Sequence, residues 1–399
     1  MRVLYIHQYF TTPGRGGATR SFEFSKRLAA RGHKVLMVTG TSLPPEAWQE
    51  IPAGVTVVSS NTPYSNSFSG KRRIISFLHF AFKAIRLGWN FQPDVIIATS
   101  TPLTVGLPAL VLSWRHRVPF VFEVRDLWPE APIQMGAIRN PIIIRFLRWF
   151  EKLIYEKAVH VIALSPGMRE GILSVGVPSE KVTVIPNSSD VGLFQPGPVD
   201  TEFLLERGLE VRPTIAYAGT LGEANAIDVL GAAAVELKKR KSSLQIVVAG
   251  DGKYRQYLDR LIEREGLDNL VLLGKVSKQD VARLYKASMA GLVLFSDVPI
   301  LQTNSPNKFF DLLAAGRPVI TNMRGWIAEL VREHDIGYVA EGSDVQGLTN
   351  AMLNAATGER FEEMAANARR LAEQEFDRDS LARIFESVLL GATERVRAK

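Results

Sequence analysis

Residues 305–321 read SPNKFFDLLAAGRPVIT, and this stretch decides the fold class more than any other part of the chain. Ser305 and Pro306 are typical of a helix start, and Gly316 is typical of the position just past a helix end. Val319–Thr321 is β-branched throughout, as expected of a buried strand. The segment therefore predicts a helix of about ten residues that leads directly into a strand.

The start of this helix carries polar groups suited to a nucleotide. Backbone amides at a helix N-terminus attract phosphate, and Lys308 adds a positive charge there. Asp311 lies three residues further along the same face, where its carboxylate can accept hydrogen bonds from ribose hydroxyls. The alternative is an ordinary amphipathic helix with a Lys308–Asp311 surface pair.

Short apolar runs alternate with helical stretches along the whole chain. We expect strands at 3–6, 34–39, 55–59, 95–99, 120–124, 159–164, 182–185, 214–217, 244–249, 271–273, 291–295 and 319–321. Helices are expected between them, the first near 19–31 and the last near 377–396. This rhythm predicts an α/β protein with two doubly wound, Rossmann-like domains that face a central cleft.

Proline and glycine residues place the domain boundary. They cluster between residues 196 and 213, where the alternation of strands and helices pauses and then restarts. We therefore expect an N-terminal domain over 1–196, a C-terminal domain over 197–376, and a final helix over 377–399 that packs back toward the N-terminal domain.

Charge is unevenly distributed along the chain. The 399 residues carry a net charge of +7, yet residues 1–196 hold 22 Lys and Arg against 12 Asp and Glu, whereas residues 197–399 hold 26 against 29. The first half is thus the basic half, suited to phosphates or to an anionic membrane surface. The absence of cysteine excludes disulfides and thiolate chemistry. We expect neither a signal peptide nor a membrane-spanning segment.

Glycine turns follow several of the expected strands. Gly16 and Gly17, after the first strand, allow backbone amides to approach a phosphate. Gly219–Thr220 and Gly250–Gly252 form comparable turns in the second half, the latter suited to close approach by a base or ribose. The strand at 34–39 is not followed by a ribose-binding acid, which argues against a nicotinamide enzyme. Plain tight turns are the alternative.

Charged side chains gather at the end of the strand at 120–124. They are Glu123, Arg125, Asp126 and Glu130. Strand ends are functional positions in such sheets, although a structural ion-pair cluster would have the same composition. No metal site is predicted, because the six histidines are scattered and no His-x3-His pair occurs.

Eight short motifs carry a family resemblance. They occur in this order: the glycines at 16–17, FEVRDLWPE at 122–130, SPGM at 165–168, IPN at 185–187, AGTLG at 218–222, AGDG at 249–252, LGKV at 273–276, and the segment 305–319. Together they resemble glycosyltransferase family 4, which has the GT-B fold, and in particular its subgroup of bacterial polysaccharide enzymes.

The resemblance implies a retaining transfer of a sugar from a nucleoside diphosphate donor, most commonly UDP-linked, without a metal or other cofactor. The implied catalytic residues are Lys308 on the diphosphate, with Arg125 and Asp126 near the transferred sugar and Asp126 as candidate base. The expected donor-binding residues are Gly16, Gly17, Gly219, Thr220, Gly250, Asp251, Gly252, Ser305, Asn307, Lys308, Phe309 and Asp311. The expected acceptor-side residues are Arg20, Glu123 and Glu130.

The chain departs from the family pattern in three places. Thr303 and Asp311 stand where the family often has two glutamates. Glu223 and Asn225 follow the Gly219 turn, where many relatives carry an Arg/Lys pair, so Lys308 or Arg20 is expected to neutralise more of the phosphate charge. Arg125 replaces a common histidine.

The segment 71–89 is basic at its start and rich in aromatic residues. It suits an anionic membrane surface, while buried helix packing explains its apolar part equally well. The expected acceptor is a polyprenyl-diphosphate-linked or other saccharide, the expected location is the cytoplasm or its membrane face, and no nucleic-acid partner is expected. Two other functions remain open: a GT-B sugar-nucleotide epimerase and a non-catalytic sugar-nucleotide-binding protein.

Overall fold

The computed structural model describes residues 1–15, 19–41, 49–65, 68–188 and 190–397. The chain divides into two compact units, one made of Met1–Pro186 with Asp379–Lys399 and the other of Asn187–Arg378. The second unit thus begins ten residues ahead of the boundary expected from the prolines. Asn187 is held to the second unit, because its side-chain Nδ2 donates a hydrogen bond to the carbonyl oxygen of Ser305 at 2.7 Å.

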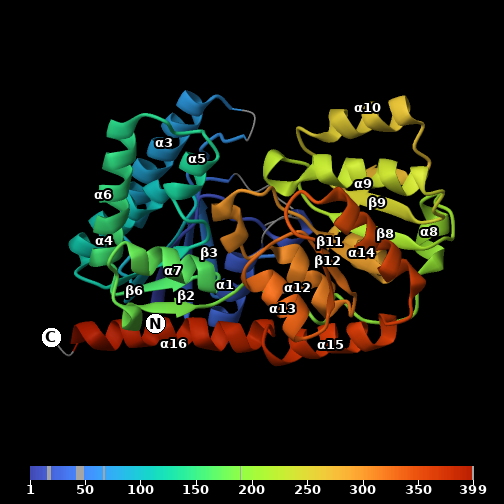
Figure 1. Ribbon diagram of the computed structural model, residues 1–399. Coiled ribbons are helices and arrows are strands. Elements are labelled where there is room, and N and C mark those ends of the chain that lie inside the picture. The colour runs from blue at the N-terminus through green and yellow to red at the C-terminus, as the bar shows by residue number, and fades with distance from the viewer. Residues whose placement is uncertain (16–18, 42–48, 66–67, 189, 398–399) are drawn as a thin grey trace. The chain divides into compact units, whose positions relative to one another are not determined.

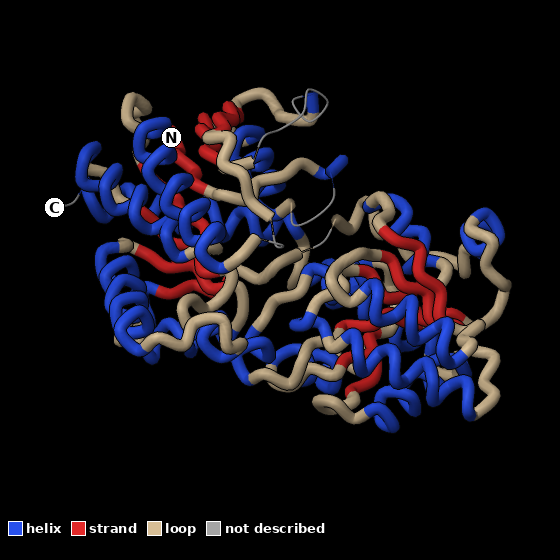
Figure 2. Tube along the Cα trace, turned by 90° about the horizontal axis from the view of Figure 1, so that it is seen from above, coloured by secondary structure: helices blue, strands red, loops and turns tan. Residues whose placement is uncertain are grey.

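The first unit, here called unit 1, contains a seven-stranded parallel sheet in the order β3-β2-β1-β4-β5-β6-β7. Helices cover both of its faces (Figures 1 and 2). The strands are β1 (Arg2–Ile6), β2 (Lys34–Thr39), β3 (Val55–Ser59), β4 (Val95–Thr99), β5 (Phe120–Val124), β6 (His160–Ala163) and β7 (Val182–Val184). The described helices are α1 (Arg20–Ala30), α3 (Gly70–Gly88), α4 (Gly106–His116), α5 (Glu130–Gln134), α6 (Pro141–Lys157), α7 (Pro166–Ser174) and α16 (Arg378–Arg397), with 3-10 turns η1 (Pro13–Arg15), η2 (Leu103–Val105) and η3 (Ser179–Lys181).

Alternation along β1 explains why this sheet is covered on both faces. Val3 and Tyr5 point into a core that also contains Phe24 of α1 and Phe385 of α16. The ring centroid of Phe385 lies 4.7 Å from that of Phe24. Leu4 and Ile6 are equally buried, and because successive side chains of a strand alternate, they point to the opposite face. The last helix of the chain therefore forms part of the core of unit 1.

The second unit, here called unit 2, contains a six-stranded parallel sheet in the order β10-β9-β8-β11-β12-β13. Its strands are β8 (Thr214–Ala218), β9 (Gln245–Ala249), β10 (Leu270–Gly274), β11 (Ala290–Val293), β12 (Val319–Thr321) and β13 (Gly337–Val339). Its helices are α8 (Thr201–Glu206), α9 (Ile227–Lys239), α10 (Arg255–Glu265), α11 (Lys278–Lys286), α12 (Asn307–Ala314), α13 (Trp326–Glu333), α14 (Val345–Thr357) and α15 (Phe361–Gln374), with 3-10 turns η4 (Glu223–Asn225) and η5 (Pro299–Thr303).

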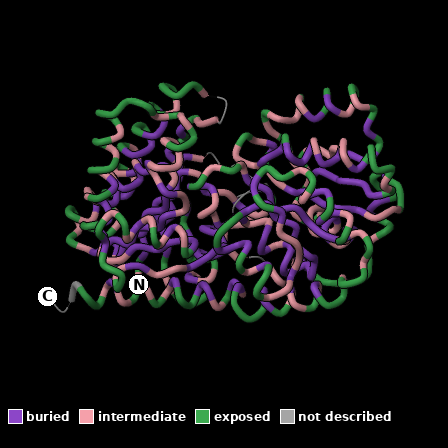
Figure 3. Tube along the Cα trace, viewed as in Figure 1, coloured by how far each residue is buried: buried purple, intermediate pink, exposed green. Residues whose placement is uncertain are grey.

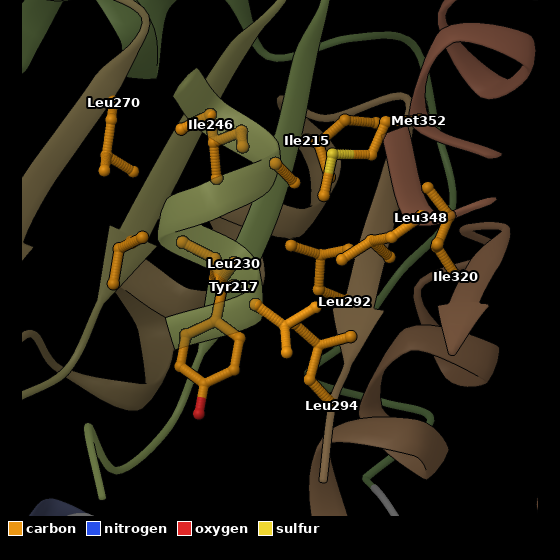
Figure 4. Close-up of a cluster of buried hydrophobic side chains, with 14 of the residues drawn as sticks. Ile215, Tyr217, Leu230, Ile246, Leu270, Leu292, Leu294, Ile320, Leu348 and Met352 are labelled. Carbon is orange, nitrogen blue, oxygen red and sulfur yellow. The ribbon is translucent and has the colours of Figure 1, made fainter. Parts of the chain in front are cut away.

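The core of unit 2 lies between its sheet and helices α9, α10 and α14. Figure 4 shows aliphatic side chains of the sheet, among them Ile215, Ile246 and Leu292, meeting Leu230 of α9 and Met352 of α14. The Tyr217 ring packs in this cluster, while its hydroxyl oxygen points away from it (Figure 4). Tyr217 thus links the core to the turn at the end of β8.

Every expected strand is confirmed to within one or two residues at each end, because buried parallel strands are continuous apolar runs. The strand β13 was missed, since Gly337–Val339 is short and its residues are only half-buried. The expected start of α12 was wrong: the helix begins at Asn307 and Ser305 does not cap it. Gly316 has a φ of +58° just past its end, as expected.

Candidate active site

Two glycine turns lie against each other at the carboxyl ends of β8 and β9. The Gly219 N–H donates to the Ala249 carbonyl at 2.9 Å. A Cβ on Gly250 would lie 1.8 Å from the Gly219 carbonyl oxygen, so only glycine fits there. Both turns therefore consist of closely packed backbone. Thr220 and Asp251 are exposed beside them, so the turns leave room for a ligand to approach.

Lys308 of α12 reaches this backbone. A Cβ on Gly219 would lie only 3.2 Å from the Lys308 Nζ. The Nζ donates to the Tyr217 hydroxyl at 3.2 Å and to Asn225 Oδ1 at 3.4 Å. It also lies 4.3 Å from the centroid of the Tyr217 ring. The ammonium is thus fixed against the Gly219 turn by neutral partners.

No carboxylate pairs with Lys308 among the ion pairs of the described residues. Burial lowers the pKa of Lys308 from 10.5 to about 7, because the charged form has lost water and gained no anion. A ligand anion placed here would supply the missing charge and raise that pKa. The alternative of a Lys308–Asp311 surface pair is therefore wrong.

The structure shows the local contacts of Asn225 and Thr303, two residues at which the chain departs from the family pattern. Asn225, which ends η4, accepts a hydrogen bond from Lys308, where a second base would repel it. Thr303 donates its hydroxyl proton to the Ile300 carbonyl at 2.7 Å. Lys308 is consequently the cation that lies against the Gly219 turn.

Asp311 lies in a different environment on the same helix. Burial raises the pKa of its carboxyl to about 6, and the charges of Lys278 and Arg378 oppose that rise. Asp190 also lies nearby and raises the pKa further. No ion pair or side-chain hydrogen bond of Asp311 occurs within the described ranges, so its carboxylate oxygens have capacity for a ligand.

The remaining expected residues in α12 and just before it divide between structural and ligand-binding roles. Ser305 accepts a hydrogen bond from the Asn187 backbone at 3.2 Å, so its hydroxyl holds the start of unit 2. Phe309 is fully buried against Phe310, and its side chain belongs to the core instead of the expected donor site. Asn307 is half-exposed in the first turn of the helix and remains available.

Arg125 and Asp126 follow β5 in unit 1. The Arg125 Nη1 lies 3.3 Å from His7 Nε2, and the Arg125 backbone N–H donates to Ser100 Oγ at 3.0 Å. His7 is buried, and its pKa is well below the usual value because of desolvation and the Arg125 charge. Burial raises the pKa of Asp126 to about 6, against the lowering effect of Arg125. Asp126 is thus ionised at neutral pH but close to titrating.

Arg20 and Glu123 form a buried ion pair, which corrects their expected acceptor-side role. The Arg20 Nε donates to Glu123 Oε1 at 2.9 Å, and the two side chains are 3% and 0% exposed. Arg20 also donates to the Pro186 and Ile185 carbonyls, and Thr99 donates to Glu123. These hydrogen bonds engage the pair in the interior of unit 1, so removal of either side chain would leave the other charge buried and unpaired.

Glu130 also has a structural partner, since its Oε1 accepts from Arg148 Nε at 2.8 Å. Gly16 and Gly17 lie outside the described residues. Sequence analysis missed His7 and Gln8, although polar residues directly after a buried strand were the available signal. Gln8 lines a hollow of about 300 Å³ at the carboxyl ends of β1, β2 and β3, with Tyr9, Thr41, Asn61 and Tyr64 among its other walls.

In the part of the chain that the structure describes, no group of three or more His, Asp and Glu side chains is arranged to hold a metal ion.

Two family models match the chain, one for each unit. The "Glycosyl transferase 4-like domain" matches residues 15–188, and "Glycosyl transferases group 1" matches residues 212–357. Together with the two parallel Rossmann-like sheets, they define a GT-B glycosyltransferase. The chain belongs to the family-4-like glycosyltransferases, as the eight motifs indicated.

Several known proteins are similar over most of their length. The alpha-monoglucosyldiacylglycerol synthase of Streptococcus pneumoniae is 24% identical, over 89% of this chain and 78% of that protein. The putative colanic acid biosynthesis glycosyl transferase WcaI of Escherichia coli is 22% identical, over 98% and 100%. Among solved structures, Anabaena Alr3699/HepE in complex with UDP-glucose has a TM-score of 0.75 at 19% identity, covering 98% of this chain and 100% of that one.

Proposed function

We propose that the chain is a retaining, metal-independent glycosyltransferase that transfers a sugar from a UDP-linked donor to a lipid-linked or saccharide acceptor. The reaction would serve the assembly of a cell-surface polysaccharide or glycolipid. One observation carries the donor assignment: the ammonium of the half-buried Lys308 lies against the Gly219 turn without an acidic partner among the described residues. Two relatives named for glycolipid and polysaccharide synthesis support the acceptor class.

The arrangement around Lys308 suits stabilisation of a leaving diphosphate. Negative charge accumulates on the diphosphate as the glycosidic bond breaks, and a fixed cation then stabilises the transition state more than the ground state. Asp311, whose carboxylate has spare acceptor capacity, would bind the ribose hydroxyls. The donor nucleotide is proposed to be UDP because a solved structure of similar fold is a complex with UDP-glucose.

Arg125 and Asp126 are the proposed residues near the transferred sugar. His7 holds the Arg125 guanidinium in place. With a pKa of about 6, Asp126 is a base of moderate strength at neutral pH. In this proposal it accepts a hydrogen bond from the acceptor hydroxyl.

The basic segment 71–89 forms most of α3, and its side chains are divided between core and surface. Phe77 and Phe80 are buried, whereas Ile75 and Phe82 are 67% and 63% exposed. The packing explanation therefore holds for part of the segment only. Because Lys71 and Arg72 are also exposed, the outer side of α3 suits an anionic bilayer. Of the helices described, none is both long and apolar enough to cross a membrane.

The test is turnover with purified protein. UDP-sugars are incubated with and without a polyprenyl-diphosphate-linked saccharide, in the presence of EDTA, and released UDP is measured. Acceptor-dependent UDP release and a product with the donor's anomeric configuration are expected. Isomerised donor without acceptor would instead indicate an epimerase, and UDP binding without turnover on any acceptor would indicate a binding protein. Activity that requires added Mg²⁺ or Mn²⁺ would overturn metal independence.

A further inference from the structure

Gln8 is a buried amide at the carboxyl end of the sheet of unit 1. The strands of this sheet are buried along most of their length (Figure 3), and Gln8 follows the end of β1 by two residues. The residue is 1% exposed, and within the described ranges neither its Nε2 nor its Oε1 has a hydrogen-bond partner. A donor and an acceptor buried without partners lower stability, so such groups in native proteins are almost always paired. Gln8 therefore points to a ligand that pairs with its amide.

The end of β2 holds Gln8 in place. The Gly40 N–H donates to the Gln8 carbonyl oxygen at 3.0 Å, and the Thr39 hydroxyl donates to the same oxygen at 3.2 Å. A Cβ on Gly40 would lie 3.1 Å from the Gln8 Cγ, so the glycine leaves the space that the side chain occupies. The backbone of Gln8 is thus fully engaged, while its amide lines the hollow of about 300 Å³ at the ends of β1, β2 and β3.

This hollow combines aromatic rings with polar, uncharged groups. The rings of Tyr9 and Tyr64 lie 4.7 Å apart between centroids, and both residues are only half-buried. Thr41 and Asn61 add a hydroxyl and a second amide to the walls, and none of the described lining residues is charged. Burial raises the pKa of Tyr9, an effect that the charge of Arg73 opposes, so Tyr9 is neutral at physiological pH. The walls therefore favour a neutral ligand.

We infer that the hollow binds an uncharged pyranose ring through a neighbouring pair of hydroxyl groups. The Gln8 amide presents an acceptor and a donor side by side, so Oε1 can accept from one hydroxyl while Nε2 donates to the oxygen of the next. The C–H face of the sugar ring can pack against a tyrosine ring. A phosphate group offers mainly acceptor oxygens, which would leave Oε1 unpaired.

The site lies away from the residues proposed to act on the transferred sugar. In the strand order β3-β2-β1-β4-β5, the strand that precedes Asp126 is two strands from β1 and four from β3. At about 4.8 Å per strand, the hollow is about 10–20 Å from the end of β5, which exceeds the width of one sugar ring. If the proposed transferase function holds, the hollow binds a non-reacting sugar of the acceptor. The acceptor then contains at least two sugars and is an oligosaccharide that the enzyme extends.

The test is an NMR titration of the full chain, labelled with ¹⁵N, without a donor nucleotide. The probes are the methyl glycosides of glucose, galactose and mannose, each of which carries neighbouring hydroxyls. At least one is expected to shift the side-chain NH₂ signals of Gln8, assigned by their loss in Gln8→Met, in a saturable manner. Tetrahydropyran-2-methanol, which has the ring without the hydroxyl pair, and pyrophosphate are expected to leave these signals unchanged.

The variant Gln8→Met keeps the length of the side chain and removes its amide. It is expected to bind the glycoside at least tenfold more weakly, measured by the shifts of neighbouring backbone amides, and to melt no lower than wild type, because no buried hydrogen bond is lost. Gln374→Met, which replaces an exposed glutamine at the end of α15, is the matched control and should bind the glycoside as wild type.

Three results would overturn the inference. They are the absence of a saturable shift with every glycoside at its highest soluble concentration, glycoside binding by Gln8→Met within twofold of wild type, and a lower melting temperature of Gln8→Met, which would show that the amide is paired internally. A shift caused by pyrophosphate alone would identify a phosphate site and would also overturn it. Glycoside binding without turnover would contradict the proposed transferase function alone, whereas turnover without glycoside binding would contradict this inference alone.

Discussion

Replacing Lys308 by methionine is expected to change stability and ligand affinity in opposite directions. Methionine keeps the apolar stem but removes the ammonium that donates to Tyr217 and Asn225. In the free protein this ammonium is desolvated without an acidic partner, which lowers its pKa to about 7. In the complex, the same ammonium would contact the diphosphate.

The stability effect follows from the direction of the pKa shift. The folded-state pKa lies below the unfolded value of 10.5, so the unfolded state binds more protons between about pH 7 and pH 10.5. Lys308 therefore costs most stability below pH 7, and the cost disappears as the pH approaches 10.5. At 1.36 kcal/mol per pKa unit the full shift corresponds to roughly 4–5 kcal/mol. Because the side chain is partly exposed, we expect Lys308→Met to raise the free energy of unfolding by only about 1–3 kcal/mol at pH 7.

The affinity effect has the opposite sign. A hydrogen bond to a charged group contributes about 1.5–3 kcal/mol, so the variant should bind UDP roughly 10–150-fold more weakly. Wild-type affinity should also fall above pH 7, by up to about tenfold per pH unit, as Lys308 loses its proton. This pH dependence of UDP affinity should be absent in the Lys308→Met variant.

Thermal unfolding and titration calorimetry with UDP at pH 7 and pH 9 measure both effects. Lys239→Met, which removes an exposed lysine at the end of α9, is the control for charge alone. If Lys308→Met binds UDP within twofold of wild type, Lys308 does not contact the diphosphate. A loss of stability in the variant at pH 7 would refute the electrostatic argument.

Three further outcomes are expected. Asp311→Asn should weaken UDP binding about tenfold in calorimetry but leave pyrophosphate binding unchanged, because pyrophosphate lacks the ribose. An equal loss of affinity for both ligands would contradict the assignment of Asp311 to the ribose. Arg20→Met should lower the free energy of unfolding by about 3–5 kcal/mol in urea titrations, since it leaves Glu123 buried and unpaired, and Arg20→Met/Glu123→Gln should recover part of it. Gly250→Ala should lower the free energy of unfolding by about 2 kcal/mol or more and reduce UDP affinity, because the added Cβ would displace the Gly219 turn. An unchanged melting temperature and unchanged UDP affinity would show that the turn can shift to accommodate the Cβ.

The sequence predicted the fold because local rules and the tertiary structure agree along the strands. A parallel strand buried on both faces must be an almost continuous apolar run, and Val95–Thr99 is such a run with every residue buried. Gly250 and Gly316 were also identifiable, since only glycine tolerates the close approach or left-handed backbone found there. Lys308 was predicted as a phosphate ligand from its place at the start of a helix, where backbone amides attract anions.

The tertiary structure alone decided which charged and apolar side chains are used internally. Arg20 and Glu123 are 103 residues apart, so no local pattern indicates that they neutralise each other in the interior of unit 1. Phe309 and Phe146 are both aromatic residues of amphipathic helices, yet the first is fully buried and the second is 57% exposed. Periodicity shows that a helix has an apolar face, but burial depends on which distant segments pack against that face, and their positions are set only when the chain is folded.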